Sequence, residues 1–185
     1  QKSLKQKEVL KNTNIADYSY LLDTVDIPTI PFSNTYQLLA NRALNYAKST
    51  NYYLTKSSES FKITKKYLVP ANKFIAIDLD SSSPFNKDYF ALKIYQELEK
   101  SLFQNKEYEL LAYFSLDRYK FLKSKIDISE SQFLEAIEDL QNRFENPLAK
   151  DLISLEKAMS LKRRANKEEY PLDNNKAIAI ANKII

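Results

Sequence analysis

The chain has 185 residues, a formal net charge of +4 from 28 Lys and Arg against 24 Asp and Glu, and no glycine, histidine or cysteine. Without glycine it cannot form the phosphate-binding loops, dinucleotide-binding turns or nucleophile elbows that need that residue at fixed positions. Without histidine and cysteine it lacks the two ligand types that dominate zinc sites and also a thiolate nucleophile. We therefore expect no cofactor and a protein that is not an enzyme.

The missing glycine also indicates a fold class. Tight hairpin turns depend on glycine, whereas helices can end at Asn, at Lys or before a proline. At 44% hydrophobic residues, the chain can build one sizeable core. The composition therefore predicts an all-α, single-domain bundle.

The N-terminal stretch QKSLKQKEVLKN is rich in Lys and opens without methionine, so we interpret it as the start of a mature or trimmed product. We expect residues 1–14 to form a flexible leader or tether and residues 15–185 to form the helical domain. Within that domain, the pattern IADYSYLLDT predicts a short helix over residues 15–24. The prolines that follow at positions 28 and 31 mark a connector.

A longer helix is predicted from Ser33 or Asn34, either of which suits the N-cap position, to about residue 56. Its apolar residues recur at helical spacing and are Tyr36, Leu39, Ala40, Ala43, Ala47 and Leu54. The next segment, residues 61–80, is ambiguous. Phe61, Ile63, Tyr67 and Val69 alternate as they would in a strand, so one short hairpin or an irregular segment is expected here.

Two helices follow with clearer patterns. The first begins near Asn86 and carries Tyr89, Phe90, Ile94, Leu98 and Leu102. The second runs from Glu107 to Lys125 and is apolar on most sides, which is typical of a helix in the middle of a bundle.

Three further helices complete an expected total of six or seven. Ser129 and Gln132 form a capping box at the start of one, and Pro147 suits the first turn of the next. We expect Leu148, Leu152, Leu155 and Met159 to face inward on that second helix. Asn174 or Asn175 is the expected cap of the last helix, whose inward residues would be Ala177, Ile178, Ala181 and Ile185.

Two carboxylates stand one residue apart in FIAIDLDSS, at Asp78 and Asp80. This stretch resembles motif one of the haloacid dehalogenase-type phosphatases. The resemblance implies that Asp78 is a nucleophile, that Asp80 is a general acid and base, and that magnesium lies between them. The alternative is that Asp80 and the serines solvate a loop and cap the following helix, and we favour it because the remaining sequence predicts helices rather than the parallel sheet of that family.

A basic cluster in LKRRANKEEY supplies the candidate binding residues Lys162, Arg163, Arg164 and Lys167, with Tyr170 beside them. Such clusters contact phosphates, sulfated sugars or acidic protein surfaces, and an aromatic ring can stack on the bound group. Glu168 and Glu169 follow directly and dilute the positive charge. A solvated helix end is the alternative interpretation.

The composition, rich in Lys, Asn, Ile, Tyr and Ser, together with the polar leader and the helical pattern, resembles the mature ectodomains of Borrelia-type spirochaetal surface lipoproteins. The resemblance implies a cell-surface domain that is held by a lipid anchor outside this sequence and contacts a host or vector protein. No apolar run is long enough to span a membrane. The alternative is a cytoplasmic helical scaffold or nucleic-acid-associated protein that uses the basic cluster.

Overall fold

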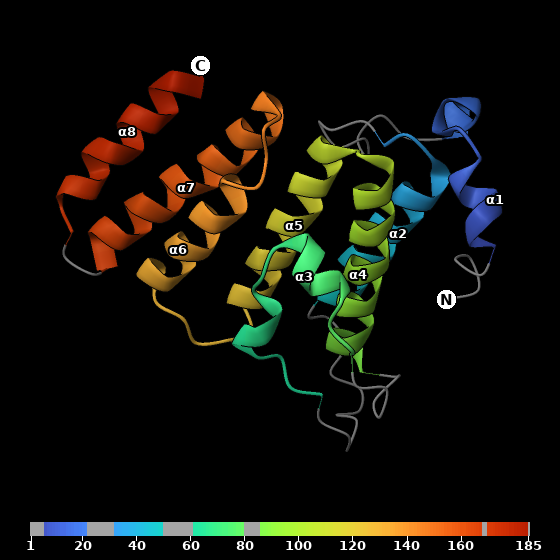
Figure 1. Cartoon of the computed structure of the whole chain (residues 1–185), viewed down its shortest axis with the longest axis horizontal. Coiled ribbons are helices and arrows are strands. Elements are labelled where there is room, and N and C mark those ends of the chain that lie inside the picture. Colours follow the sequence, from blue (N-terminus) through green and yellow to red (C-terminus); the bar gives the residue numbers. More distant parts are fainter. Residues whose placement is uncertain (1–5, 22–31, 50–60, 80–85, 168–169, 185) are drawn as a thin grey trace. The chain divides into compact units, whose positions relative to one another are not determined.

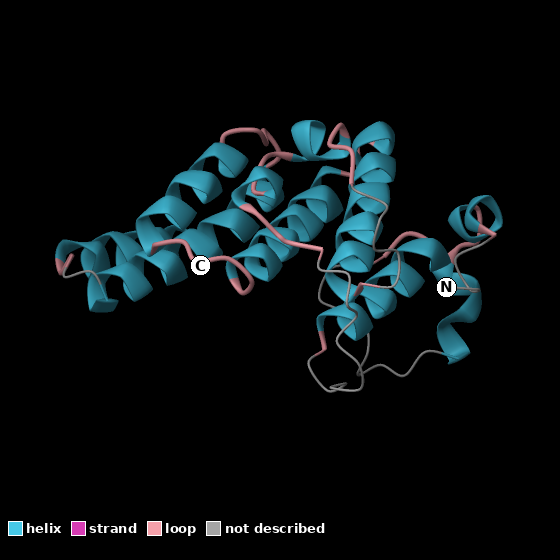
Figure 2. Cartoon of the chain, turned by 90° about the horizontal axis from the view of Figure 1, so that it is seen from below, coloured by secondary structure: helices cyan, strands magenta, loops and turns pink. Residues whose placement is uncertain are grey.

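The computed structural model describes residues 6–21, 32–49, 61–79, 86–167 and 170–184 (Figure 1). Within these ranges it contains helices and no strand, which confirms the predicted all-α fold (Figure 2). None of the described helices is long and apolar enough to cross a lipid bilayer. The α-helices are α1 (Lys7–Lys11), α2 (Thr35–Lys48), α3 (Ala71–Ile75), α4 (Lys87–Asn105), α5 (Tyr108–Lys123), α6 (Glu130–Gln141), α7 (Pro147–Lys167) and α8 (Leu172–Ile184), and two 3-10 helices are η2 (Ile15–Leu21) and η4 (Lys65–Tyr67).

The chain divides into two compact units. Unit 1 comprises residues 1–61 and 81–98, and unit 2 comprises residues 62–80 and 99–185. Helix α4 runs through the division, with Leu98 in the first unit and Glu99 in the second. Because α4 is one continuous helix, the apolar periodicity of its sequence gives no sign of the boundary between the two units.

In unit 1, the described part of the expected leader includes helix α1, which lies against α2. The ammonium groups of Lys7 and Lys11 lie 5.4 and 5.9 Å from the centre of the Tyr36 ring. Lys7 also pairs with Glu97 at 2.6 Å, and the Thr35 hydroxyl donates to the carbonyl of Leu10 at 2.9 Å. Cation–π contacts and an ion pair therefore hold a polar segment that buries no side chain of its own.

Helix α2 begins as predicted, because the Asn34 side chain accepts a hydrogen bond from the backbone N–H of Gln37. It ends at Lys48 rather than near residue 56, and Leu54 lies outside the described residues. The segment expected to be a helix over residues 15–24 is the 3-10 helix η2 as far as Leu21. The Asn14 side chain accepts from the N–H of Ala16 at its start, a local bond that favours a tight turn.

In unit 2, helix α5 lies in the interior, as its apolar composition predicted. Its buried residues are Leu110, Leu111, Ala112, Phe114, Ser115, Leu116, Arg118, Tyr119, Phe121 and Leu122. The turn from α4 into α5 needs a positive φ, and Lys106 adopts it at 60°. This position would ordinarily suit glycine, which the chain lacks, so a lysine takes on the steric cost.

The ambiguous segment is irregular with short helices over its described residues, so of the two expected alternatives the irregular segment is confirmed and the hairpin is wrong. Its elements are η4 and α3, and the carbonyls of Tyr67 and Val69 between them turn inward toward Arg118. Arg118 donates to both carbonyls. The segment therefore satisfies backbone acceptors through a side chain of α5 instead of through a neighbouring strand.

Arg118 itself is fully buried, as is Glu99. Its Nε donates to one oxygen of Glu99 at 2.7 Å and its Nη2 to the other at 3.1 Å, and its guanidinium lies 3.9 Å from the centre of the Phe74 ring. Burial raises the pKa of Glu99, and the positive charge of Arg118 opposes that rise. The pair thus links α4, α3 and α5 through one side chain.

We predict that Arg118→Met lowers the free energy of unfolding by about 3–5 kcal/mol, because it leaves the Glu99 carboxylate buried without a partner. The matched control is Arg143→Met, which removes the exposed pair with Asp139 and should cost no more than about 0.5 kcal/mol. Urea unfolding followed by circular dichroism measures both. Equal losses in the two variants would contradict this account.

The loss in Arg118→Met should also depend on pH. Without the guanidinium, burial raises the pKa of Glu99 still further above its value in the unfolded chain. The penalty for the charged carboxylate is then present above the folded pKa and absent below the unfolded one, so the difference from wild type should shrink as the pH falls from 7 toward 4. A difference that stays constant over this range would contradict the assignment.

Candidate interaction site on helix α7

Helix α7 packs against α5, α6 and α8, the four helices that Figure 1 shows together at the C-terminal end of the chain. It begins at Pro147, as predicted, and the Asn146 side chain accepts a hydrogen bond from the N–H of Ala149. The residues that α7 buries are more often small or polar than large and apolar. They are Ala149, Ile153, Glu156, Ala158, Ser160 and Leu161.

The prediction that the leucines of α7 face inward is wrong. Leu148 is 62% exposed, Leu155 51% and Met159 49%, and Leu152 between them is half-buried. Their spacing of four, three and four residues places all of them on one helix face. We call this set (Leu148, Leu152, Leu155 and Met159) the α7 stripe, and the exposed Lys162 extends it by one turn.

Polar contacts on the side of α7 next to the stripe explain this orientation. Glu156 accepts from Arg163 at 2.6 Å and pairs with Lys120 of α5 at 2.8 Å, and the Ser160 hydroxyl donates to Glu130 of α6 at 3.0 Å. Turning the leucines inward would move Glu156 and Ser160 to the outside and break these bonds. Buried polar groups are costly unless they are paired, so this set fixes the rotation of α7.

Glu130 is the centre of this set, which we call the ion cluster (Lys120, Lys123, Glu130, Glu156, Ser160 and Arg163). Burial on its own would raise the pKa of Glu130, but the hydrogen bond and charge of Lys123 outweigh it, so the pKa lies below its usual value. Burial likewise lowers the pKa of Lys123, against the opposing effect of Glu130. Each carboxylate in the cluster has cationic partners, so its chemistry is that of a structural ion network.

The basic residues singled out in the sequence separate in the structure. Arg163 is held in the ion cluster, whereas Arg164 pairs with Asp173 of α8 at 2.6 Å and donates to the Ser131 hydroxyl at 3.2 Å. The Tyr170 ring lies 4.8 Å from the guanidinium of Arg164. Lys162 is exposed at the end of the α7 stripe, and the side chain of Lys167 lies outside what the structure describes. Lys162, Arg163 and Arg164, the basic residues whose side chains the structure describes, therefore have different surroundings.

Helix α8 begins at Leu172, two residues before the predicted cap at Asn174. The reason is Asp173 in its first turn, whose carboxylate is held inward by Arg164 and by the ammonium group of Lys176, which donates to it at 3.0 Å. Ala177 is buried as predicted, but Ile178 is exposed, and Ile180 packs against Leu134, Ala158 and Leu161 instead. The inward position of Asp173 in the first turn sets which residues of α8 face α7. Ile185 lies outside the described residues.

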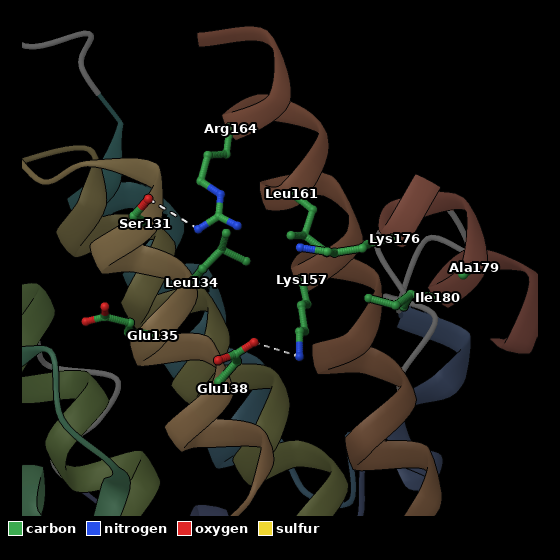
Figure 3. Close-up of a pocket in the computed structure, with 10 residues that line it drawn as sticks. All are labelled: Ser131, Leu134, Glu135, Glu138, Lys157, Leu161, Arg164, Lys176, Ala179 and Ile180. Carbon is green, nitrogen blue, oxygen red and sulfur yellow. Dashed lines mark hydrogen bonds and ion pairs between the residues drawn. The ribbon is translucent and has the colours of Figure 1, made fainter. Parts of the chain in front are cut away.

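A groove of about 460 Å³ lies between α6, α7 and α8 (Figure 3). Its lining combines apolar and charged side chains, and the charged ones other than Glu135 are already paired. Lys157 binds Glu138 at 2.9 Å across the groove, and Arg164 and Lys176 both bind Asp173. The groove is therefore a weaker candidate binding site than the exposed α7 stripe.

Of the two aspartates in FIAIDLDSS, Asp78 does not lie at the end of a strand. Asp78 is exposed in the irregular segment after α3, and Asp80 lies outside the described residues. Among the residues that the structure describes, no cluster of three acidic side chains is able to hold a metal ion. Comparison of the chain with family models, with curated proteins and with solved structures found no match.

We predict that Asp173→Asn loosens α8, because the hydrogen bond from Arg164 holds the pKa of Asp173 below its usual value. The stabilisation is therefore present above the unfolded pKa of about 3.9 and is lost as the pH falls through the lower folded pKa. Hydrogen exchange should show at least roughly fivefold faster exchange of the α8 amides at pH 7, equivalent to about 1 kcal/mol. Asp139→Asn, at an exposed pair on α6, is the control, and unchanged α8 protection in Asp173→Asn would contradict the role of this contact.

Proposed function

We propose that the protein is a non-enzymatic helical interaction module whose docking surface is the α7 stripe. The observation that carries the proposal is the exposure of Leu148, Leu155 and Met159 on one face of α7 while Glu156 and Ser160, on the adjacent side of the helix, are buried. Single exposed apolar residues are common, but a run of them along one helix face is typical of a protein-binding surface.

The occupant that fits this surface is an amphipathic helix of another protein chain. The spacing within the stripe repeats every seven residues, which matches positions a and d of a coiled-coil seam. The distance from Leu148 to Met159 is about 16 Å at 1.5 Å per residue, long enough to receive three turns of a partner helix. Lys162 at one end adds a charge that would set the direction of that helix.

We further propose, from the compositional resemblance given above, that this module acts outside the cell as the ectodomain of a bacterial outer-surface lipoprotein. The nucleic-acid alternative is less well supported, because Arg163 and Arg164 bind Glu156, Glu130 and Asp173. Phosphate binding would have to compete with these carboxylates. Protease treatment of intact cells, with the protein detected by antibody, tests the surface location, and full protection of the protein would contradict it.

The docking surface is tested with a designed three-heptad peptide that carries Leu at every a and d position and alternating Glu and Lys elsewhere. Fluorescence anisotropy should give a dissociation constant on the order of 10–100 μM with the wild-type protein. Leu155→Glu should weaken binding by roughly 30-fold, because it places a charge at the centre of the stripe.

Leu172→Glu is the matched control for this test. It makes the same chemical change at a leucine of α8 that is 71% exposed and lies outside the stripe, and peptide binding should be unchanged. Absence of binding to the wild-type protein, or equal binding to both variants, would contradict the proposed surface.

A further inference from the structure

We propose that the chain that docks on the α7 stripe is a second copy of this protein, with the two α7 helices antiparallel. This inference rests on the proposed function, because it names the partner of that surface. It follows from the order of residues along the stripe, from one unpaired charge at each end, and from the two-fold symmetry that such residues permit.

The stripe is symmetric about the midpoint between Ile153 and Ser154. An antiparallel copy placed on that midpoint brings Leu148 level with Met159 of the other copy, and Leu152 level with Leu155. These contacts occur twice, once in each direction, as a two-fold interface requires. All members of the stripe are then paired, and each a position meets a d position.

Charge is complementary in the same register. Lys162 lies at the level of Glu145 of the other copy, which precedes α7 in the connection from α6. Both residues are exposed, and neither has an ion-pair partner within the described part of the chain. The antiparallel arrangement would therefore form two equivalent Lys162–Glu145 pairs. A parallel arrangement would instead place Lys162 of one copy beside Lys162 of the other, so that two like charges would meet.

Such a dimer should be of modest affinity. Each copy contributes a short stripe rather than a broad apolar face, so the buried area lies at or below the lower end of stable interfaces, roughly 1,200 Å² in total. We expect a dissociation constant of roughly 10–100 μM. Analytical ultracentrifugation between about 1 μM and 1 mM should show a reversible shift from monomer to dimer.

Leu155→Glu should raise the dissociation constant at least 30-fold, and Leu172→Glu should leave it unchanged. Circular dichroism and thermal unfolding establish that both variants are folded. Lys162→Glu should weaken the dimer by bringing two carboxylates together, and the double variant Lys162→Glu with Glu145→Lys should restore it. Failure of this charge exchange to restore dimerisation would overturn the register.

The missing cysteines make the direction of the helices directly testable. Leu148→Cys alone and Met159→Cys alone should not crosslink. In the antiparallel dimer each of these positions lies about 16 Å along the helix axis from the same position in the other copy. A mixture of the two variants under mild oxidation should form a disulfide-linked heterodimer. Crosslinking of either variant by itself would indicate a parallel pair and overturn the proposal.

A wild-type protein that remains monomeric to 1 mM also overturns this inference. The designed peptide then separates the two proposals. If it still binds wild type and not Leu155→Glu, the stripe receives a helix from a different protein and the proposed function stands. If it does not bind, the docking surface itself is wrong.

Discussion

The ion cluster between α5, α6 and α7 determines which side of α7 faces outward. Glu130 and Glu156 are almost fully buried, and each is bonded to cations from more than one place in the sequence. Losing these partners would leave buried carboxylates unpaired, which costs more than the exposure of a few apolar side chains. The apolar stripe is thus exposed because unpairing the buried polar residues of the same helix would cost more free energy than exposing the stripe does.

This competition also explains what the sequence could and could not predict. The all-α fold, the Asn34 cap, the capping box at Ser129 and the interior position of α5 depend on local signals or on overall apolarity, and they were predicted correctly. Which side of α7 faces the interior depends on partners far away in the sequence, such as Glu130, which binds Ser160. Periodicity selected the leucines as the inner face because it weighs apolar residues alone.

The basic cluster illustrates the same limit. Adjacent Lys and Arg residues indicate a positive surface only if their partners are water, yet Arg163 and Arg164 bind different carboxylates of the protein itself. Asp173 lies nine residues beyond Arg164, on the other side of the turn, where no spacing rule connects them. The buried Arg118 was missed for a related reason, since a charged residue in an apolar helix is ordinarily assigned to its exposed edge.

A chain without glycine has few ways to reverse direction or to bring backbone close to a ligand, and unit 2 meets this constraint with side chains. Lys106 adopts the positive φ of a helix end, and Arg118 binds the carbonyls of an irregular segment that no strand accompanies. The side chain of Arg118 is committed to the interior, as are those of Glu130, Glu156 and Ser160 in the ion cluster. The exposed surface of α7 therefore includes the apolar stripe and the exposed charged residues Lys150, Asp151 and Lys162, and an apolar contact with charged edges is what the proposed helical partner would meet.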